Sequence, residues 1–326
     1  MNTYLDSAIL VQFWNSFPTQ FPDGNECEIE KWNTFWTFIK KETNLFISSS
    51  EELNSIFVTK LSSGRGDYKI EFHNGKSNKY FRNKVNNKSP HSFYCLSETN
   101  LDEKNKYIKK NGYLIGFQDD FLEKWKDLKL LERPKILPVR EGCRVPYFSS
   151  WQKLDEYLTP FTDLVLVDNY IFSDESMITS NFEQIITQFD KSTPVKYNLT
   201  IITFEGGRFK LNGQKLYDDI LELKMMNNWK CKIGLVLSTQ NVKEHDRGIF
   251  TNYIRIVTGD SFNYFDSMNK IRTHTDITFR SLANPDESNS AIEALSSIGK
   301  IIKYMVKHFE KTHVFGDIKN DLIDQL

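Results

Sequence analysis

The segment Asp163–Tyr170 has the sequence DLVLVDNY, an apolar run followed by three polar residues. An aliphatic run without alternation is typical of a strand that is buried on both faces, so Asp163–Val167 is predicted to be such a strand. Two further strands are predicted downstream, over Leu199–Phe204 and Lys232–Leu237, and helices are predicted between the three strands, over Glu183–Phe189 and Gln214–Asn227. This alternation predicts an α/β sheet with at least some parallel strands and with helices over its faces.

The rest of the second half extends this pattern. Trp151–Leu158 is predicted to be a helix, Ile249–Val257 a fourth strand, and about Ser288–Lys311 a long final helix. The final helix carries a stripe of apolar residues along one side. We expect that side to cover the sheet; the alternative is that it forms the seam of a dimer.

The first half is predicted to be a mixed α/β unit whose fold the pattern does not specify. Helices are predicted over Tyr4–Phe17, over Glu28–Lys41 and from Ser49 to about Ser62, and strands over Tyr68–His73, Ser92–Leu96 and Tyr113–Phe117. The segment Pro138–Pro146 carries two prolines and a glycine, and apolar periodicity stops there. We therefore predict two domains, residues 1–145 and residues 146–326.

Composition limits the classes of function. The chain has 326 residues, of which 39% are hydrophobic and 26% charged, so it can form a core and is not a disordered chain. A net charge of −1 excludes a protein that binds polyanions over its whole surface. The first residues lack the pattern of a signal peptide, and no apolar stretch is long enough to span a membrane, so we expect a cytoplasmic protein. Four widely spaced cysteines predict neither a disulfide framework nor a zinc site.

Positive charge is concentrated in one stretch of the first half. Residues 1–150 hold 22 Lys and Arg against 19 Asp and Glu, and residues 151–326 hold 20 against 24. Within Asn74–Tyr94 there is no acidic residue, and aromatic residues are interleaved with five cations, Lys76, Lys79, Arg82, Lys84 and Lys88. Cations and stacking rings are what a nucleic-acid backbone requires, so we expect a binding surface here. The alternative is a solvated, asparagine-rich loop.

Polar groups follow three of the predicted strands. They are Asp168-Asn169-Tyr170, Glu205-Gly206-Gly207 and Glu244-His245-Asp246-Arg247. Ligands of α/β sheets bind at the carboxyl ends of strands, so these groups are expected to meet at one edge. A histidine can serve as nucleophile or general acid near neutral pH, and an arginine can hold two phosphate oxygens.

The last of these groups resembles the phospholipase D signature. That signature is His-x-Lys, four residues, Asp, six residues, Gly, then Gly or Ser, one residue and Asn. In this chain His245, Arg247, Asn252 and Gly259 have the matching spacing. Four residues depart from the signature. Arg247 replaces the lysine and Asn252 replaces the aspartate. Asp260 stands where the signature has Gly or Ser, and Phe262 stands where it has Asn, while Asn263 follows one residue later.

A closer resemblance is to the phospholipase-D-like C-terminal domain of microtubule-interacting-and-trafficking proteins. Those domains show Asp-x-Tyr after the first strand, and His-Asp-Arg followed by Thr and a strand. The corresponding residues here are Asp168-Asn169-Tyr170, His245-Asp246-Arg247 and Thr251. The resemblance covers about residues 150–270. The resemblance implies a mixed sheet flanked by helices, and a module that recognises phosphate. It also implies a symmetric dimer, as is common in the family.

The resemblance leaves three functions open. The first is binding of a phosphodiester polymer such as nucleic acid without turnover, which would fit a role in bacterial defence. The second is a homodimeric nuclease with His245 as nucleophile, since the enzymes pair two such motifs and this chain has one. The third is a scaffold that contacts only another protein, in part through its N-terminal half.

The residues assigned to the site follow from the same resemblance and from the basic stretch. We expect His245, Arg247 and Asn252 in catalytic positions. Substrate contacts are expected from Asp168, Tyr170, Asp246 and Asn263, and from Lys76, Lys79, Arg82, Lys84 and Lys88. No metal is expected, because the cysteines lack the spacing of a zinc site, and no cofactor is expected, because the chain carries no nucleotide-binding fingerprint.

Overall fold

The computed structural model describes residues 1–16, 26–73, 92–97, 101–117, 135–140, 142, 146–206, 210–240, 242 and 247–324. The chain divides into two compact units, Met1–Arg133 with Ser281–Ser288, and Pro134–Arg280 with Asn289–Leu326. This division differs from the expected boundary at residue 145. The reason is that β6 (Lys135–Val139) pairs with β12 (Thr275–Ser281) in the sheet of the second unit.

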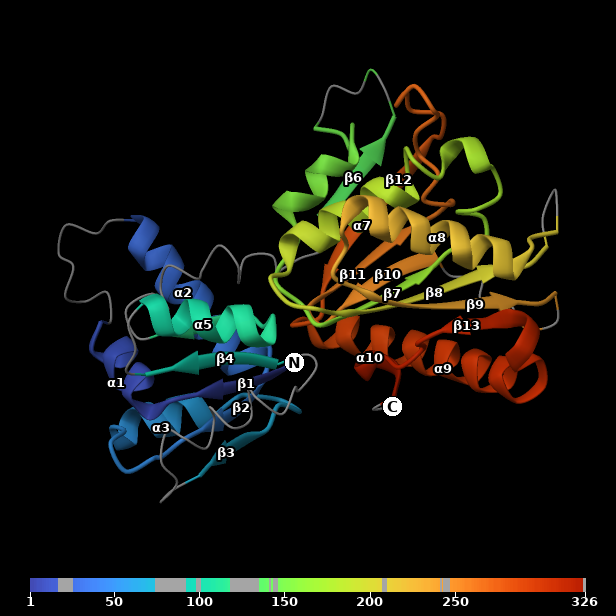
Figure 1. The fold of residues 1–326 in the computed structure, drawn as a ribbon. Helices are drawn as coiled ribbons and strands as arrows, with labels where there is room; N and C mark the ends of the chain where they lie inside the picture. Colours follow the sequence, from blue (N-terminus) through green and yellow to red (C-terminus); the bar gives the residue numbers. More distant parts are fainter. Residues whose placement is uncertain are drawn as a thin grey trace. The chain divides into compact units, whose positions relative to one another are not determined.

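The first unit is built on a five-stranded parallel sheet (Figure 1). Its strands are β1 (Asn2–Leu5), β2 (Asn44–Ile47), β3 (Ile70–Phe72), β4 (Ser92–Leu96) and β5 (Ile115–Phe117), in the order β3-β2-β1-β4-β5. All four neighbouring pairs are parallel. The order reverses between β1 and β4, which is the arrangement of a doubly wound α/β sheet. The local sequence pattern does not specify this arrangement.

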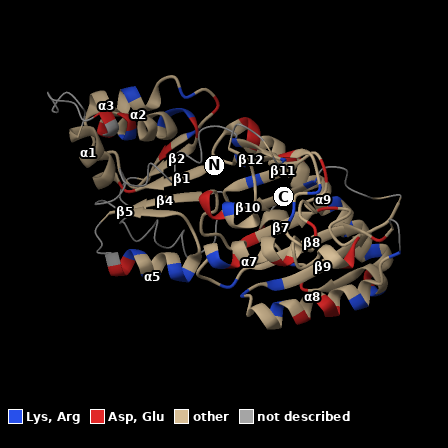
Figure 2. Cartoon of the chain, turned by 90° about the horizontal axis from the view of Figure 1, so that it is seen from above, with Lys and Arg blue, Asp and Glu red and all other residues tan. Residues whose placement is uncertain are grey.

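Helices cover both faces of this sheet. They are α1 (Ser7–Asn15), α2 (Glu26–Lys41), α3 (Ser55–Ser62) and α5 (Leu101–Asn111). Figure 2 shows α2 and α3 on one side of the strands and α5 on the other. This is what right-handed crossovers require when the strand order runs outward in two directions from β1 and β4.

The start of the first predicted helix is wrong. Tyr4 belongs to strand β1 rather than to a helix over Tyr4–Phe17, and α1 begins only at Ser7. The Tyr4 ring stacks on Phe46 of β2 at 4.8 Å and on Tyr94 of β4 at 5.1 Å, and both are its register partners. Pairing with a strand on each side therefore overrides the helical spacing of the apolar residues.

The second unit is built on an eight-stranded mixed sheet. Its remaining strands are β7 (Asp163–Val167), β8 (Asn198–Phe204), β9 (Lys232–Ser238), β10 (Arg247–Thr251), β11 (Ile254–Thr258) and β13 (Val314–Gly316). The order is β13-β9-β8-β7-β10-β11-β12-β6. Strands β7, β8 and β9 are parallel, whereas β10 is antiparallel to β7. The α/β class predicted from the alternation is thus confirmed.

Helices cover both faces of this sheet, because the apolar strands β7, β8 and β9 have to be buried on both faces. In Figure 1, α7 (Phe182–Ser192) and α8 (Gly213–Asn227) lie on one face, and α9 (Pro285–His313) and α10 (Asp321–Asp324) lie on the other. The apolar side of α9 is buried at Leu295, Ile298 and Met305, so it covers the sheet as expected. All five residues of β7 are buried, as its unbroken apolar sequence predicts.

Two elements differ from their predictions. The strand expected over Ile249–Val257 is a hairpin of β10 and β11, which turns at Asn252 and Tyr253. The helix expected over Trp151–Leu158 is a short 3₁₀ helix, η2 (Trp151–Glu156).

Candidate functional site

The candidate site lies where the carboxyl end of β7 meets the start of β10. The two strands are antiparallel, with Gly248 opposite Val167. Asp168, directly after β7, and Arg247, the first residue of β10, are therefore brought to the same edge of the sheet. The order of strands thus places together two residues that are 79 positions apart in the sequence.

Asp168 ties this edge to the loop after β11. Its Oδ1 accepts a hydrogen bond from the backbone N–H of Tyr170 at 2.9 Å. Its Oδ2 accepts bonds from the hydroxyl of Ser261 and the N–H of Phe262, both at 2.7 Å. Burial raises the pKa of the fully buried Asp168 carboxyl above its usual 3.8, while these three hydrogen bonds and the charge of Arg247 act against that rise.

Arg247 is held at two points and presents further donors. Its Nη1 donates to the carbonyl oxygen of Gly259 at 3.1 Å, and its guanidinium carbon lies 5.6 Å from the centroid of the Tyr170 ring. Its Nε is buried and has no hydrogen-bond partner among the described residues. A guanidinium fixed in this way keeps donor capacity for a ligand that brings its own acceptors.

Asn263 completes this cluster from the loop after β11. Its Nδ2 donates to the carbonyl oxygen of Tyr170 at 2.7 Å, and its Oδ1 is buried without a partner among the described residues. Four residues expected in the site, Asp168, Tyr170, Arg247 and Asn263, therefore do lie together. They form what we call the Arg247 cluster.

The structure does not bring Asn252 to this cluster. Asn252 follows β10, five residues after Arg247, which at about 3.3 Å per residue is the opposite end of the strand. Its Oδ1 accepts hydrogen bonds from the backbone N–H groups of Thr162 at 2.8 Å and Asp163 at 3.3 Å. The side chain is fully buried and joins the hairpin to the start of β7, which is a structural role.

The other expected site residues lie outside the described residues. These are His245, Asp246, Lys76, Lys79, Arg82, Lys84 and Lys88. Their roles remain predictions from the sequence.

Some polar groups at this edge were not predicted from the sequence. The hydroxyl of Ser261 is one of the three donors to Asp168. A separate group lies after β8, where Glu205 Oε2 is 3.2 Å from both His313 Nε2 and Lys210 Nζ. No motif marks Ser261 or His313, because each reaches its partner only through the folding of the sheet.

Residues of both charge signs lie along helix α8. Figure 2 shows Lys and Arg alternating with Asp and Glu along α8. No group of three or more His, Cys, Asp or Glu side chains is placed to hold a metal ion within the described ranges. Among the described helices, none combines the length and the apolar character needed to cross a bilayer.

Comparison with known proteins gives a distant structural neighbour. No protein-family model and no curated protein matches the chain. The crystal structure of phosphatidylserine synthase from Haemophilus influenzae Rd KW20 aligns with a TM-score of 0.30 and 10% sequence identity. The alignment covers 62% of this chain and 47% of that one, so it spans about half the length of the synthase. What the site can bind therefore has to follow from its own side chains.

Proposed function

We propose that the second unit binds a phosphate group of a phosphodiester polymer, with Arg247 as the principal cation. The observation that carries this proposal is the guanidinium of Arg247 at the carboxyl edge of the sheet, whose exposed end makes one hydrogen bond and whose Nε has no partner among the described residues. A guanidinium offers parallel N–H groups that match two phosphate oxygens. The neighbouring carbonyl of Gly259 and ring of Tyr170 hold it in place before a ligand arrives.

The resemblance supports the same residue. Arg247 stands at the position of the signature lysine, whose charge neutralises phosphoryl oxygens in the phospholipase D family. Asn263 supplies a polar group beside it. His245, two residues before Arg247, would supply a further donor to the phosphate.

We propose nucleic acid as the source of the phosphate. The acid-free stretch Asn74–Tyr94 offers cations and aromatic rings, which together suit a phosphate backbone and its bases. With a net charge of −1, binding depends on such local groups rather than on the overall field of the protein. A role in defence against foreign nucleic acid fits this combination.

Fluorescence anisotropy with labelled oligonucleotides tests the proposal. Single-stranded and double-stranded DNA and RNA are titrated with the protein at two salt concentrations, and we expect weaker binding at the higher one. Arg247→Ala is expected to weaken binding by about tenfold. Arg247→Lys is expected to weaken it by less, since lysine keeps the positive charge but lacks the paired N–H donors of the guanidinium. Arg272→Ala, which removes an arginine that is ion-paired with Asp174 in the same unit, is the matched control.

Two results would change the conclusion. Unaltered affinity in Arg247→Ala, or a loss in Arg272→Ala equal to that in Arg247→Ala, would overturn the assignment of Arg247. Cleavage of the oligonucleotide that is lost in His245→Ala would replace binding alone with a nuclease activity.

A further inference from the structure

A cavity of about 410 Å³ lies in the second unit, lined by residues other than those of the Arg247 cluster. Three segments surround it: residues 149–152 at the start of η2, residues 179–184 around the start of α7, and residues 265–269 in the turn after β11. Its volume is in the range of about 300–1,000 Å³ that is usual for small-molecule sites.

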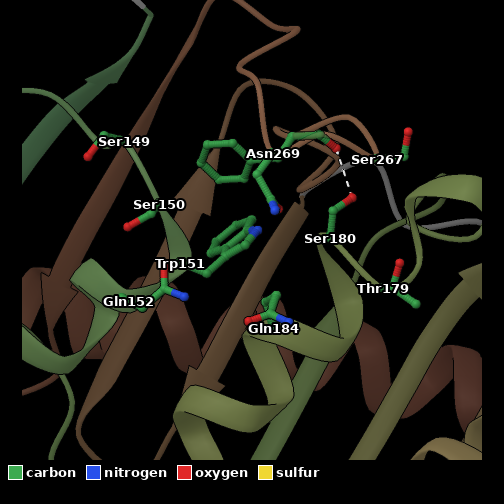
Figure 3. Close-up of a pocket in the computed structure, with 10 residues that line it drawn as sticks. Ser149, Ser150, Trp151, Gln152, Thr179, Ser180, Gln184, Ser267 and Asn269 are labelled. Carbon is green, nitrogen blue, oxygen red and sulfur yellow. Dashed lines mark hydrogen bonds between the residues drawn. The ribbon is translucent and has the colours of Figure 1, made fainter.

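The lining of this cavity is polar and carries no charge. Of the ten residues that line it, none is Asp, Glu, Lys, Arg or His. Three amide side chains, those of Gln152, Gln184 and Asn269, come from the three different segments, and most of the remainder are serine or threonine hydroxyls. In Figure 3 the amide of Asn269 approaches the Trp151 indole from above, and Gln152 and Gln184 lie below it.

These amides are available to a ligand. None of Gln152, Gln184 and Asn269 uses its side chain in a hydrogen bond with another described residue. Each amide offers two N–H donors and one carbonyl acceptor, and each hydroxyl can both donate and accept. The lining therefore suits a neutral ligand whose own groups both donate and accept.

The wall behind these amides is rigid. The Trp151 Nε1 donates to Asn181 Oδ1 at 3.2 Å, and the indole stacks on Tyr264 with ring centroids 5.0 Å apart. Asn181 also holds the backbone of Phe265, donating to its carbonyl at 2.7 Å and accepting from its N–H at 3.0 Å. A cavity whose wall is ordered in this way needs little rearrangement to bind.

We propose that this cavity binds a neutral polyhydroxylated ring, a sugar unit. A charged ligand would find no counter-charge in the lining. A nucleobase would need an open aromatic face, but Trp151 and Phe265 are each only 2% exposed. A peptide would need an edge strand or apolar pockets for side chains, whereas hydroxyls and amides dominate here. Ring hydroxyls, each both donor and acceptor, match the amides and hydroxyls of the three segments.

The test is a titration of the 326-residue chain with D-glucose, D-galactose and D-ribose, in which binding is measured by saturation-transfer NMR and calorimetry. We expect saturable binding of at least one sugar. Gln184→Glu keeps the shape of the side chain and replaces its N–H donors by acceptors, so it is expected to weaken that binding by about tenfold. Asn269→Asp should act likewise, since aspartate also tolerates the left-handed backbone found at residue 269, with φ 58°.

Matched variants separate this site from the phosphate site. Gln12→Glu makes the same chemical change at an exposed position of α1 in the first unit and should leave sugar binding unchanged. Arg247→Ala should also leave it unchanged, while Gln184→Glu should leave oligonucleotide binding unchanged. Absence of saturable binding by all three sugars, or equal affinity in wild type, Gln184→Glu and Asn269→Asp, would overturn the proposal.

Discussion

The guanidinium carbon of Arg247 lies 5.6 Å from the centroid of the Tyr170 ring, although 77 positions separate the two residues in the sequence. Such a cation–π contact stabilises the arginine by about 0.5–1 kcal/mol at an accessible site and fixes the plane of its fork. We predict that Tyr170→Leu weakens oligonucleotide binding by roughly two- to fivefold, measured by anisotropy. Tyr170→Phe keeps the ring and should bind as wild type; a loss in Tyr170→Phe equal to that in Tyr170→Leu would assign the effect to the hydroxyl instead.

The charge of Arg247 also acts on the pKa of Asp168, as the smallest of several contributions. Burial raises the Asp168 pKa above 3.8 in the folded protein, so the folded state binds this proton more tightly than the unfolded state. The contribution of Asp168 to the free energy of unfolding therefore falls as the pH rises from 3.8, the pKa of the unfolded state, through the higher pKa of the folded state. Arg247→Ala removes a charge that opposes the rise, so we predict a higher Asp168 pKa and a larger fall over that pH range.

Urea unfolding at a series of pH values, with carbon NMR of the Asp168 carboxyl, measures this coupling. Asp168→Asn removes the titrating group. It should therefore abolish the difference in pH profile between the protein that keeps Arg247 and the protein that carries Arg247→Ala. Parallel profiles for wild type and Arg247→Ala, with Asp168 in place in both, would show that the two side chains are not coupled.

The strands of the second unit are predictable because they are long and unbroken in the sequence. Asp163–Val167 is strand β7 at the predicted bounds, and the helix predicted over Gln214–Asn227 starts one residue earlier, at Gly213. The segment Ile249–Val257, predicted to be one strand, is a hairpin. The sequence does not reveal its turn, because the turn carries no glycine or proline. The first strand of this hairpin, β10, carries the pairing of Gly248 with Val167 that builds the candidate site.

The first unit was less predictable because its strands are short. Strands β3 and β5 have three residues each, too few for alternation to be distinguished from chance. The highly charged helix α5 (Leu101–Asn111) has few apolar residues to reveal its period. The parallel order of the sheet follows from long-range pairing, which no local pattern records.

A buried arginine in the first unit gives a prediction about stability. Arg65 donates to the carbonyl oxygens of Ile39 and Thr43, both at 2.7 Å, and burial lowers its pKa to about 10. Lysine has a single nitrogen in place of the Nη1 and Nη2 atoms that bond these two carbonyls and lacks the planar guanidinium, so Arg65→Lys should lower the free energy of unfolding by about 2–4 kcal/mol. Lys110→Arg, the reverse exchange at an exposed position of α5, should change it by less than about 0.5 kcal/mol in urea unfolding. Equal effects of the two exchanges would contradict the role of Arg65.

Asn252 has the spacing of a signature residue in the sequence, but in the fold it lies away from the Arg247 cluster. Its Oδ1 accepts from the backbone of Thr162 at 2.8 Å, at the end of β10 opposite to Arg247. We predict that Asn252→Ala lowers the free energy of unfolding by about 1–3 kcal/mol, because two buried N–H groups lose their acceptor, yet leaves oligonucleotide affinity unchanged. Asn252→Asp keeps an acceptor oxygen but buries a second carboxyl group beside Asp163, so it should also lose stability in the same urea measurement. If Asn252→Ala instead weakened binding as much as Arg247→Ala while unfolding at the wild-type urea concentration, Asn252 would belong to the site after all.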